Sequence, residues 1–433
     1  MQALLSFDQA PPFAAPFRFF ITAPLFAIVA GFLLLWGGPD LMASRWTPSA
    51  LALTHLITVG FMMQVMLGAM VQILPVVAGA NIAQSLRVAR IVHLAITLGA
   101  FLLVLAFLTY DSLAFIMAAS CLGLGVFIFI GATAHALYHV PSSTPTIRGL
   151  KLAQVGLGVT VGLGMLLAVS LALSLPFPVM QIADIHLVWG FLGWGSVLLA
   201  AVAFVVVPMF QLTPPYPDWF GRSYAYVALS VAVLWTWGEL ASWSLFSTLL
   251  SGVLVVVAAL FSLITLRTQR KSKRVKFDAT QHYWRMAMLS TLAASGLWAA
   301  AQMIPLLGDW QGWPLLFGVL LLMGGFMSVI IGMLYKIVPF LVWLHLQNMG
   351  RSRLMAPNMK KVLSEQQMQR QMWAHFAAFA LLVLAVFWPV WFIYPAGVAL
   401  IVANAWLLRN LLAAAGVYRR HRLKIEALLA TQP

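Results

Sequence analysis

Residues 50–78 read ALALTHLITVGFMMQVMLGAMVQILPVVA, a run without a single Asp, Glu, Lys or Arg. A helix needs about 20 apolar residues to cross the hydrocarbon core of a membrane, which is about 30 Å thick. The run therefore predicts a membrane-spanning helix. It carries one histidine, His55, near one end and one proline, Pro75, near the other.

The composition of the whole chain has the same character. Of the 433 residues, 63% are hydrophobic and 8% are charged, and the mean hydropathy is +0.96. A soluble protein of this size needs far more charged residues on its surface, so a soluble fold is excluded. The single cysteine, Cys121, excludes a disulfide framework and any metal site built from several cysteines.

Eleven further apolar runs accompany the first, which gives twelve predicted spans. They are residues 18–37, 50–78, 88–110, 112–139, 149–174, 183–211, 222–240, 245–266, 284–306, 313–344, 371–392 and 394–412. No hydrophilic stretch is long enough for a second domain. We therefore predict an all-α polytopic membrane protein, with one transmembrane domain over residues 1–433 and a basic tail at 413–433.

The net charge of +15 would suggest a nucleic-acid partner if the basic residues were scattered. Instead, all but two of the 25 Lys and Arg residues fall at alternate helix ends on one side; Arg45 lies on the opposite side and Lys336 within a helix. Because Lys and Arg are retained in cytoplasmic loops, we expect both termini to be cytoplasmic. The expected partner is thus a lipid bilayer, the inner membrane of a bacterium, and not nucleic acid.

An internal repeat relates three of the spans. Three glycines each precede a proline by 15 residues, and each is followed eight residues later by a second small residue. The sets are Gly60, Gly68 and Pro75; Gly193, Ala201 and Pro208; and Gly324, Gly332 and Pro339. Small residues let membrane helices approach closely. We predict three four-helix repeats, at 18–139, 149–266 and 284–412, around a pseudo-threefold axis, although glycine and proline are also common in membrane helices generally.

Two histidines occupy similar positions in the first two repeats. His55 and His186 precede their prolines by 20 and 22 residues, which places them about 30 and 33 Å from those prolines along the helix. An ionisable side chain inside a span is a functional candidate by default. Two neutral imidazoles facing each other in a helical bundle are the usual axial ligands of a b-type haem. The alternative is that each histidine only bonds a neighbouring hydroxyl or carbonyl group.

The third repeat has Val319 or Phe317 where its histidine would lie, which limits the chemistry available there. A methionine as axial ligand stays open as an alternative. Four other histidines, His93, His135, His139 and His375, are expected at cytoplasmic helix ends, with no role assigned. His135 and His139 are four residues apart and could share a metal or anchor the interface. We expect His282, His345 and His421 to belong to the solvated cytoplasmic surface.

The segment from His55 through Gly60-Phe61 to Gly68, Pro75 and Gly79 resembles the second-helix motif of the NnrS-type haem membrane proteins. A second histidine-led, glycine-rich helix follows in that family, as His186-Leu-Val-Trp-Gly190 does here. The twelve-helix architecture is similar to subunit I of the haem–copper oxidases. The resemblance implies a haem b protein with His55 and His186 as axial iron ligands. It also implies a link to the nitric oxide response or to a respiratory electron-transfer partner.

The sequence departs from both families. The NnrS-type motif usually reads His-x-His-Glu, whereas residues 52–56 here read Ala-Leu-Thr-His-Leu. An oxidase of this type also needs a His-x-His pair on the tenth span and copper-binding histidines on the seventh, and this sequence has no histidine in either span. The resemblance therefore implies the oxidase fold without its copper centre.

The acidic residues weigh on the choice between functions. All ten are expected in tails, in loops or at helix ends, whereas proton-coupled carriers and pumps need carboxylates near the midplane. We therefore do not expect a proton-pumping terminal oxidase, and the sequence assigns no catalytic residue. We expect Lys336 to extend to the cytoplasmic interface. A polytopic transporter without haem is the alternative function, and an assembly partner of a respiratory complex is a third.

Overall fold

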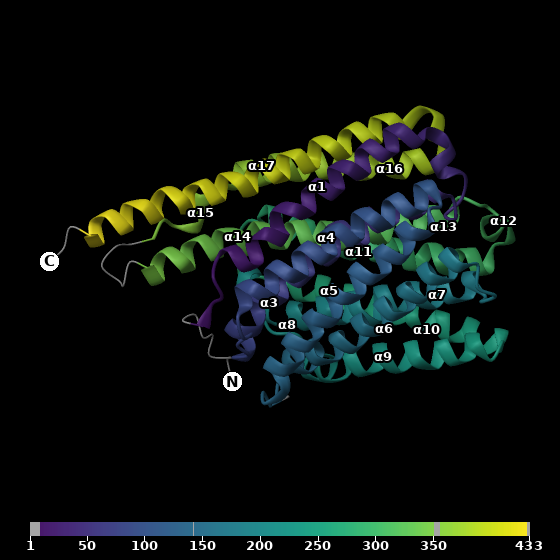
Figure 1. Ribbon diagram of the computed structural model, residues 1–433, viewed down its shortest axis with the longest axis horizontal. Helices are drawn as coiled ribbons and strands as arrows, with labels where there is room; N and C mark the ends of the chain where they lie inside the picture. The colour runs from purple at the N-terminus through teal and green to yellow at the C-terminus, as the bar shows by residue number, and fades with distance from the viewer. Residues whose placement is uncertain (1–8, 142, 350–355, 431–433) are drawn as a thin grey trace.

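The computed structural model describes residues 9–141, 143–349 and 356–430, and every regular element in these ranges is a helix (Figure 1). Unit 1 contains α1 (Ala14–Gly37), the 3-10 helix η2 (Gly38–Ala43), α2 (Pro48–His55), η3 (Leu56–Met63), α3 (Gln64–Ala78), α4 (Ser85–Thr109) and α5 (Ser112–Tyr138). Unit 2 contains α6 (Pro145–Leu173), α7 (Val179–Val188), η4 (Trp189–Ser196), α8 (Val197–Gln211), α9 (Asp218–Leu240) and α10 (Ser244–Arg270).

Unit 3 completes the chain. It contains α11 (Ala279–Met303), α12 (Pro305–Gly308), α13 (Trp313–Val319), η5 (Leu320–Met327), α14 (Ser328–Met349), α15 (Met359–Val362), α16 (Glu365–Phe387) and α17 (Pro389–Ala430). The two ends of the described chain lie toward the same end of the bundle (Figure 1). An even number of membrane crossings gives this arrangement.

Ten helices in the described part of the chain are long and apolar enough to cross a membrane. The predicted spans 222–240 and 284–306 correspond to α9 and α11, which have 23 and 25 residues but are not among the ten. Both are more polar, and α9 carries Asp218, Arg222 and Glu239. The protein thus has the architecture of a polytopic membrane protein, with ten candidate spans in the described residues by length and composition.

Each unit contains one composite helix interrupted by a π-helical segment. The segments η3, η4 and η5 are each eight residues long, and they lie between α2 and α3, α7 and α8, and α13 and α14. Their first residues, Leu56, Trp189 and Leu320, are 133 and 131 residues apart, the same intervals that separate the three prolines. In a π-helix each backbone N–H bonds the carbonyl five residues earlier, so these turns are wider than the α-helical turns around them.

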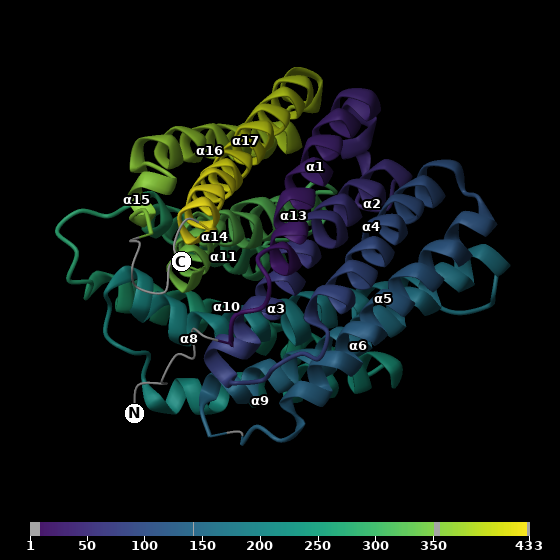
Figure 2. The same cartoon turned by 60° about the vertical axis from the view of Figure 1, so that its left-hand side comes forward.

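The three units close into a ring through corresponding helix pairs. The last helix of each unit packs on the first helix of the next: α5 on α6, α10 on α11, and α17 on α1. In Figure 2, α1 lies between α17 and α4, with which it is in contact. Within each unit the first helix packs along the π-helical segment, as α1 does on η3, α6 on η4 and α11 on η5.

Small residues allow this close packing. Gly60 is the fifth residue of η3, and a Cβ there would overlap Phe26 of α1. In unit 2 a Cβ on Gly156 of α6 would overlap the backbone carbonyl of Gly193 in η4. A Cβ on Gly324 of η5 would overlap Ser290 of α11. The glycines that define the repeat therefore lie where each composite helix meets the first helix of its unit.

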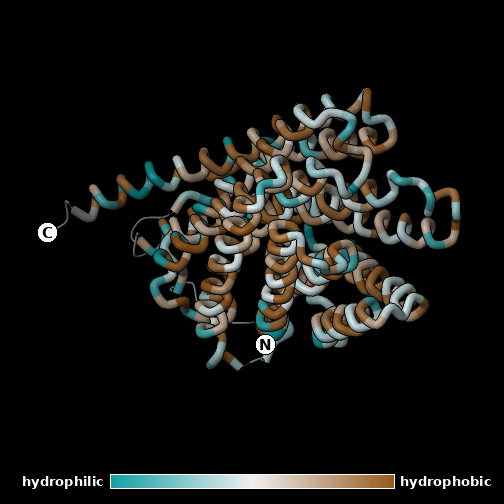
Figure 3. The backbone as a smooth tube through the Cα atoms, turned by 45° about the vertical axis from the view of Figure 1, so that its right-hand side comes forward, coloured by the Kyte–Doolittle hydropathy of each residue, from teal (hydrophilic) through white to brown (hydrophobic). Residues whose placement is uncertain are grey.

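The outer surface of the bundle is apolar along much of its length. Figure 3 shows hydrophobic residues along the helices and hydrophilic residues at many of the turns. Large side chains such as Phe101 of α4, Leu245 of α10 and Phe32 of α1 are 61%, 74% and 56% exposed. Exposed apolar area on this scale is not found on soluble monomers and is typical of the outer surface of a membrane protein.

The last predicted boundary was wrong. The sequence placed it at residue 393, within a continuous apolar run, whereas α16 ends at Phe387 and α17 begins at Pro389. Pro389 is the first residue of its helix, and the preceding Trp388 has φ −133° and ψ 70°, because a residue before proline avoids the α-helical conformation. Residues 413–430 continue α17 as a helix that projects beyond its neighbours (Figure 1).

We predict that Gly156→Ala destabilises the protein much more than Gly162→Ala. The new methyl group at Gly156 would overlap the backbone of η4, which cannot move aside as a side chain can, whereas nothing lies within 4 Å of a Cβ at Gly162. Overpacking of this kind costs about 1–3 kcal/mol or more. Thermal unfolding of the detergent-solubilised variants measures the difference, and equal melting temperatures would show that α6 and η4 are not in close contact.

Candidate functional site

The two candidate histidines lie where composite helices change to π-helical geometry. His55 is the last residue of α2, directly before η3, and His186 lies three residues before the first residue of η4. Segments of π-helix are rare and often occur at functional sites. The structure thus brings together the two residues that the sequence placed at similar depth. Their positions are not identical, because His55 lies one residue before its π-helical segment and His186 lies three residues before its own.

The two imidazole rings lie next to each other between units 1 and 2. Their centroids are 6.5 Å apart and their planes differ by 18°. His55 comes from the inner helix of unit 1 and His186 from that of unit 2, 131 residues later in the chain.

Both rings are held through the same nitrogen. Nδ1 of His55 donates to the Leu51 carbonyl at 2.7 Å, and Nδ1 of His186 donates to the Thr160 carbonyl at 2.9 Å. A carbonyl oxygen can only accept a hydrogen bond, so each Nδ1 carries the proton and each neutral ring keeps a lone pair on Nε2. Histidines that bind metals show this arrangement, in which the second nitrogen fixes the ring by donating to a carbonyl or carboxylate.

Both histidines line a cavity of about 930 Å³ at the centre of the bundle. All three units contribute to its walls, which are largely apolar, and Val319 and Phe317 of unit 3 are among the lining residues. Large apolar cavities with a few convergent polar groups are typical binding sites for cofactors and small molecules. The cavity therefore extends the site beyond the two imidazoles.

Neighbouring residues leave room for the rings and orient them. A Cβ on Gly164 of α6 would lie 3.1 Å from Cε1 of His186, so a larger residue there would press on the ring. The ring of Phe107 packs against His55 with centroids 5.0 Å apart. The position of each imidazole is thus set by a hydrogen bond and by packing.

Two charged residues near the histidines were not identified as part of the site from the sequence. Arg45 and Asp184 both line the cavity and form an ion pair at 2.9 Å. Asp184 was expected at a helix end, but it lies within α7, two residues before His186. The separation in sequence, 139 residues, hides the pairing. One feature of the sequence could have identified Arg45: it is the one basic residue expected on the side opposite to the other Lys and Arg residues.

The other histidines lie away from the cavity in the described part of the chain. Nε2 of His93 contacts the Thr22 hydroxyl at 2.8 Å. His135 is in the last turn of α5 and His139 directly follows that helix, so both lie at a helix end. No group of three or more His, Cys, Asp or Glu side chains suited to a metal ion occurs among the described residues.

The expectations for His345 and His375 were wrong. His345 packs against Phe13 and Tyr418 instead of contributing to the solvated surface. His375 is fully buried in α16, because that helix begins six residues earlier than predicted. Its Nε2 lies 2.9 Å from the Ser328 hydroxyl. His375 is thus part of the packing between α16 and α14.

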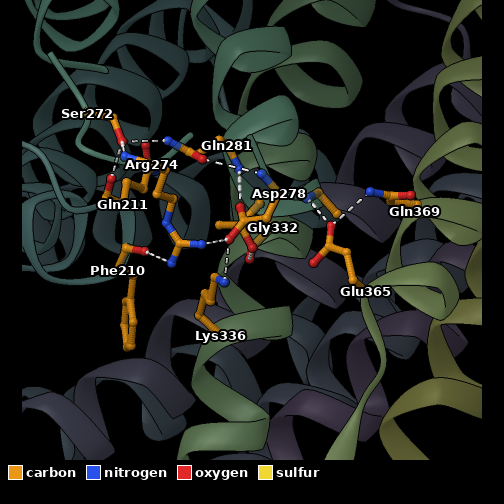
Figure 4. Close-up of polar contacts among 12 residues, drawn as sticks. Phe210, Gln211, Ser272, Arg274, Asp278, Gln281, Gly332, Lys336, Glu365 and Gln369 are labelled. Carbon is orange, nitrogen blue, oxygen red and sulfur yellow. Dashed lines mark hydrogen bonds and ion pairs between the residues drawn. The ribbon is translucent and has the colours of Figure 1, made fainter. Parts of the chain in front are cut away.

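Lys336 does not extend to open solvent. Its Nζ lies 2.7 Å from Oδ2 of Asp278, which also accepts from Arg274 at 3.0 Å (Figure 4). Oδ1 of Asp278 caps the N-terminus of α11 by accepting from the Gln281 backbone N–H at 3.0 Å. Asp278 is 8% exposed. This cluster joins the loop before α11 to α14, and none of its three charged members lines the cavity in the described residues.

No protein-family model and no curated protein matches the chain. The family resemblance of the segment around His55 therefore remains a proposal. The geometry of His55, His186 and the cavity carries the functional inference.

We predict that Asp278→Ala lowers the free energy of unfolding by about 3–5 kcal/mol, because it leaves two cations without a buried partner. Asp218→Ala is the matched control, since the Asp218–Arg222 pair is 3.9 Å long and its side chains are 91% and 70% exposed. An exposed pair contributes less than about 1 kcal/mol. Chemical unfolding of both variants in detergent compares them, and a similar small loss in both would show that the Asp278 cluster is not structural.

Proposed function

We propose that the protein binds one b-type haem in the central cavity, with His55 and His186 as the two axial ligands of the iron. The observation that supports the proposal is the pairing of two imidazoles, each fixed through Nδ1 and each with a free Nε2 lone pair. The alternative, in which each histidine only bonds a carbonyl group, accounts for Nδ1 but leaves both Nε2 atoms without a role.

The separation of the rings suits this cofactor. Two imidazoles on opposite faces of one iron, with metal–nitrogen bonds of about 2 Å, have ring centroids about 6 Å apart. The observed separation is 6.5 Å. The cavity of about 930 Å³ and its apolar walls suit a flat, largely apolar macrocycle.

The number of protein ligands also favours a haem over a free metal ion. Two imidazoles are too few for the tetrahedral or octahedral sites that proteins build for single ions, and no third His, Cys, Asp or Glu joins them among the described residues. A porphyrin supplies four nitrogens to its iron, so two protein ligands complete the coordination.

A bound haem supplies a one-electron redox centre. The two histidines would occupy both axial positions, so a diatomic gas such as nitric oxide could bind only after one imidazole moves away. The arrangement therefore favours electron transfer with a respiratory partner, with nitric oxide binding as the second role. A transporter without haem is the alternative function, and a folded protein without colour would favour it.

We further propose that α9 and α11 also cross the membrane, which gives twelve spans in three related four-helix units, as in subunit I of the haem–copper oxidases. The equal spacing of η3, η4 and η5 and the corresponding contacts between units support this proposal. The distribution of Lys and Arg favours cytoplasmic termini in a bacterial inner membrane. A reporter active only in the cytoplasm, fused to the C-terminus, tests the orientation, and an inactive fusion would contradict it.

We predict that the purified protein shows the reduced-minus-oxidised absorbance of a b-type haem and that His55→Ala and His186→Ala each abolish it. Removing a residue that only hydrogen-bonds a metal ligand typically lowers metal affinity about 10–100-fold, so removing an axial ligand itself should lower it more. His93→Ala is the control, because His93 bonds Thr22 and does not line the cavity. A folded wild-type protein without haem, from cells supplied with it, would show the proposal to be wrong.

A further inference from the structure

Arg45 occupies a distinctive place among the charged residues of the protein. It lies between η2 and α2, and it is the one Lys or Arg side chain among the described residues that line the cavity. We infer that Arg45 anchors the carboxylate groups of the cofactor that fills the cavity. The inference rests on the proposed function and adds the group that would orient the macrocycle.

The ion pair of Arg45 joins the two segments that carry the histidines. Arg45 precedes His55 by ten residues and Asp184 precedes His186 by two. Nη2 of Arg45 donates to Oδ1 of Asp184 at 2.9 Å, with the two side chains 37% and 42% exposed. The pair therefore lies at one edge of the same site, between units 1 and 2, where an anionic end of a ligand could remain in contact with water.

The guanidinium group retains unused donors. A guanidinium has five N–H donors, and within the described part of the chain only Nη2 of Arg45 has a hydrogen-bond partner. Its Cζ lies 4.3 Å from the centroid of the Trp46 ring, a cation–π contact that restricts the orientation of the group. Nε and Nη1 can thus bind a carboxylate while Nη2 keeps its bond to Asp184.

The distance along the chain is appropriate for a porphyrin. His55 lies seven residues after Pro48, the first residue of α2, which is about 10 Å along the helix axis. The carboxylates of haem b lie on short side chains at one edge of the ring. An iron held by the histidines could bring these groups toward Arg45 when that edge of the ring faces the start of α2.

The carboxylate of Asp184 allows two roles of Arg45 to be distinguished, a structural ion pair and a ligand anchor. Asp184 would share Arg45 with the ligand and repel the ligand's own carboxylates, and Glu239 also lines the cavity. If Arg45 only holds its segment against α7 through the ion pair, removing Arg45 or Asp184 should change ligand binding to the same extent. If Arg45 anchors the ligand, Arg45→Gln should weaken binding and Asp184→Asn should not.

The experiment titrates full-length protein from haem-deficient cells with iron protoporphyrin IX and with its dimethyl ester, which lacks the carboxylate charges. We expect wild type to bind the free acid at least about 10-fold more tightly than the ester, since charge-assisted hydrogen bonds are the strong ones. Arg45→Gln should remove this preference and leave ester binding unchanged. Asp184→Asn should retain or increase it, and Arg45→Lys should keep part of it.

Three results would overturn the inference. Equal binding of the two porphyrins by wild type would exclude a carboxylate anchor. Equal losses for both porphyrins in Arg45→Gln and Asp184→Asn would show that the pair only holds the helices together. Failure of a folded wild-type protein to bind either porphyrin would overturn the proposed function as well, which separates the two claims.

Discussion

The close approach of each composite helix to the first helix of its unit is the constraint on which the rest of the structure depends. Glycine is required at these points because a Cβ would overlap the neighbouring helix, as at Gly60, Gly156 and Gly324. In lipid, where water exclusion does not drive helices together, packing of this kind provides much of the attraction between them. The π-helical segments lie at these contacts, and His55 and His186 lie directly before or near them.

The membrane also explains how the polar groups are arranged. A buried polar group without a partner costs free energy in a medium that offers no water. The imidazoles of His55 and His186 each satisfy one nitrogen with a backbone carbonyl, and Asp278 lies between Arg274 and Lys336. The Nε2 atoms of these two histidines have no hydrogen-bond partner among the described residues. The proposed haem iron gives them a partner.

Much of the fold could be predicted from the sequence, because the length and position of apolar runs are set by the thickness of the bilayer. The spacing of Gly60, Gly193 and Gly324 predicted close helix contacts at these residues. The similar distances of His55 and His186 from their prolines predicted that the two histidines lie near each other.

The break at Trp388 was misplaced because hydropathy is continuous through it. The π-helical segments could not be predicted, since an i→i+5 hydrogen-bond pattern leaves no signal in hydropathy. The Arg45–Asp184 and Lys336–Asp278 pairs depend on tertiary packing between distant segments.

The central claim is that His55 and His186 bind the same iron from opposite sides. Electron paramagnetic resonance of the oxidised, purified protein tests it most directly, because the signal of a ferric haem depends on both axial ligands and on the angle between their planes. The account predicts a low-spin signal of the rhombic type given by two imidazoles in nearly parallel planes, in keeping with the 18° between the rings. A purely high-spin signal, or a low-spin signal that persists unchanged in His186→Ala, would contradict it.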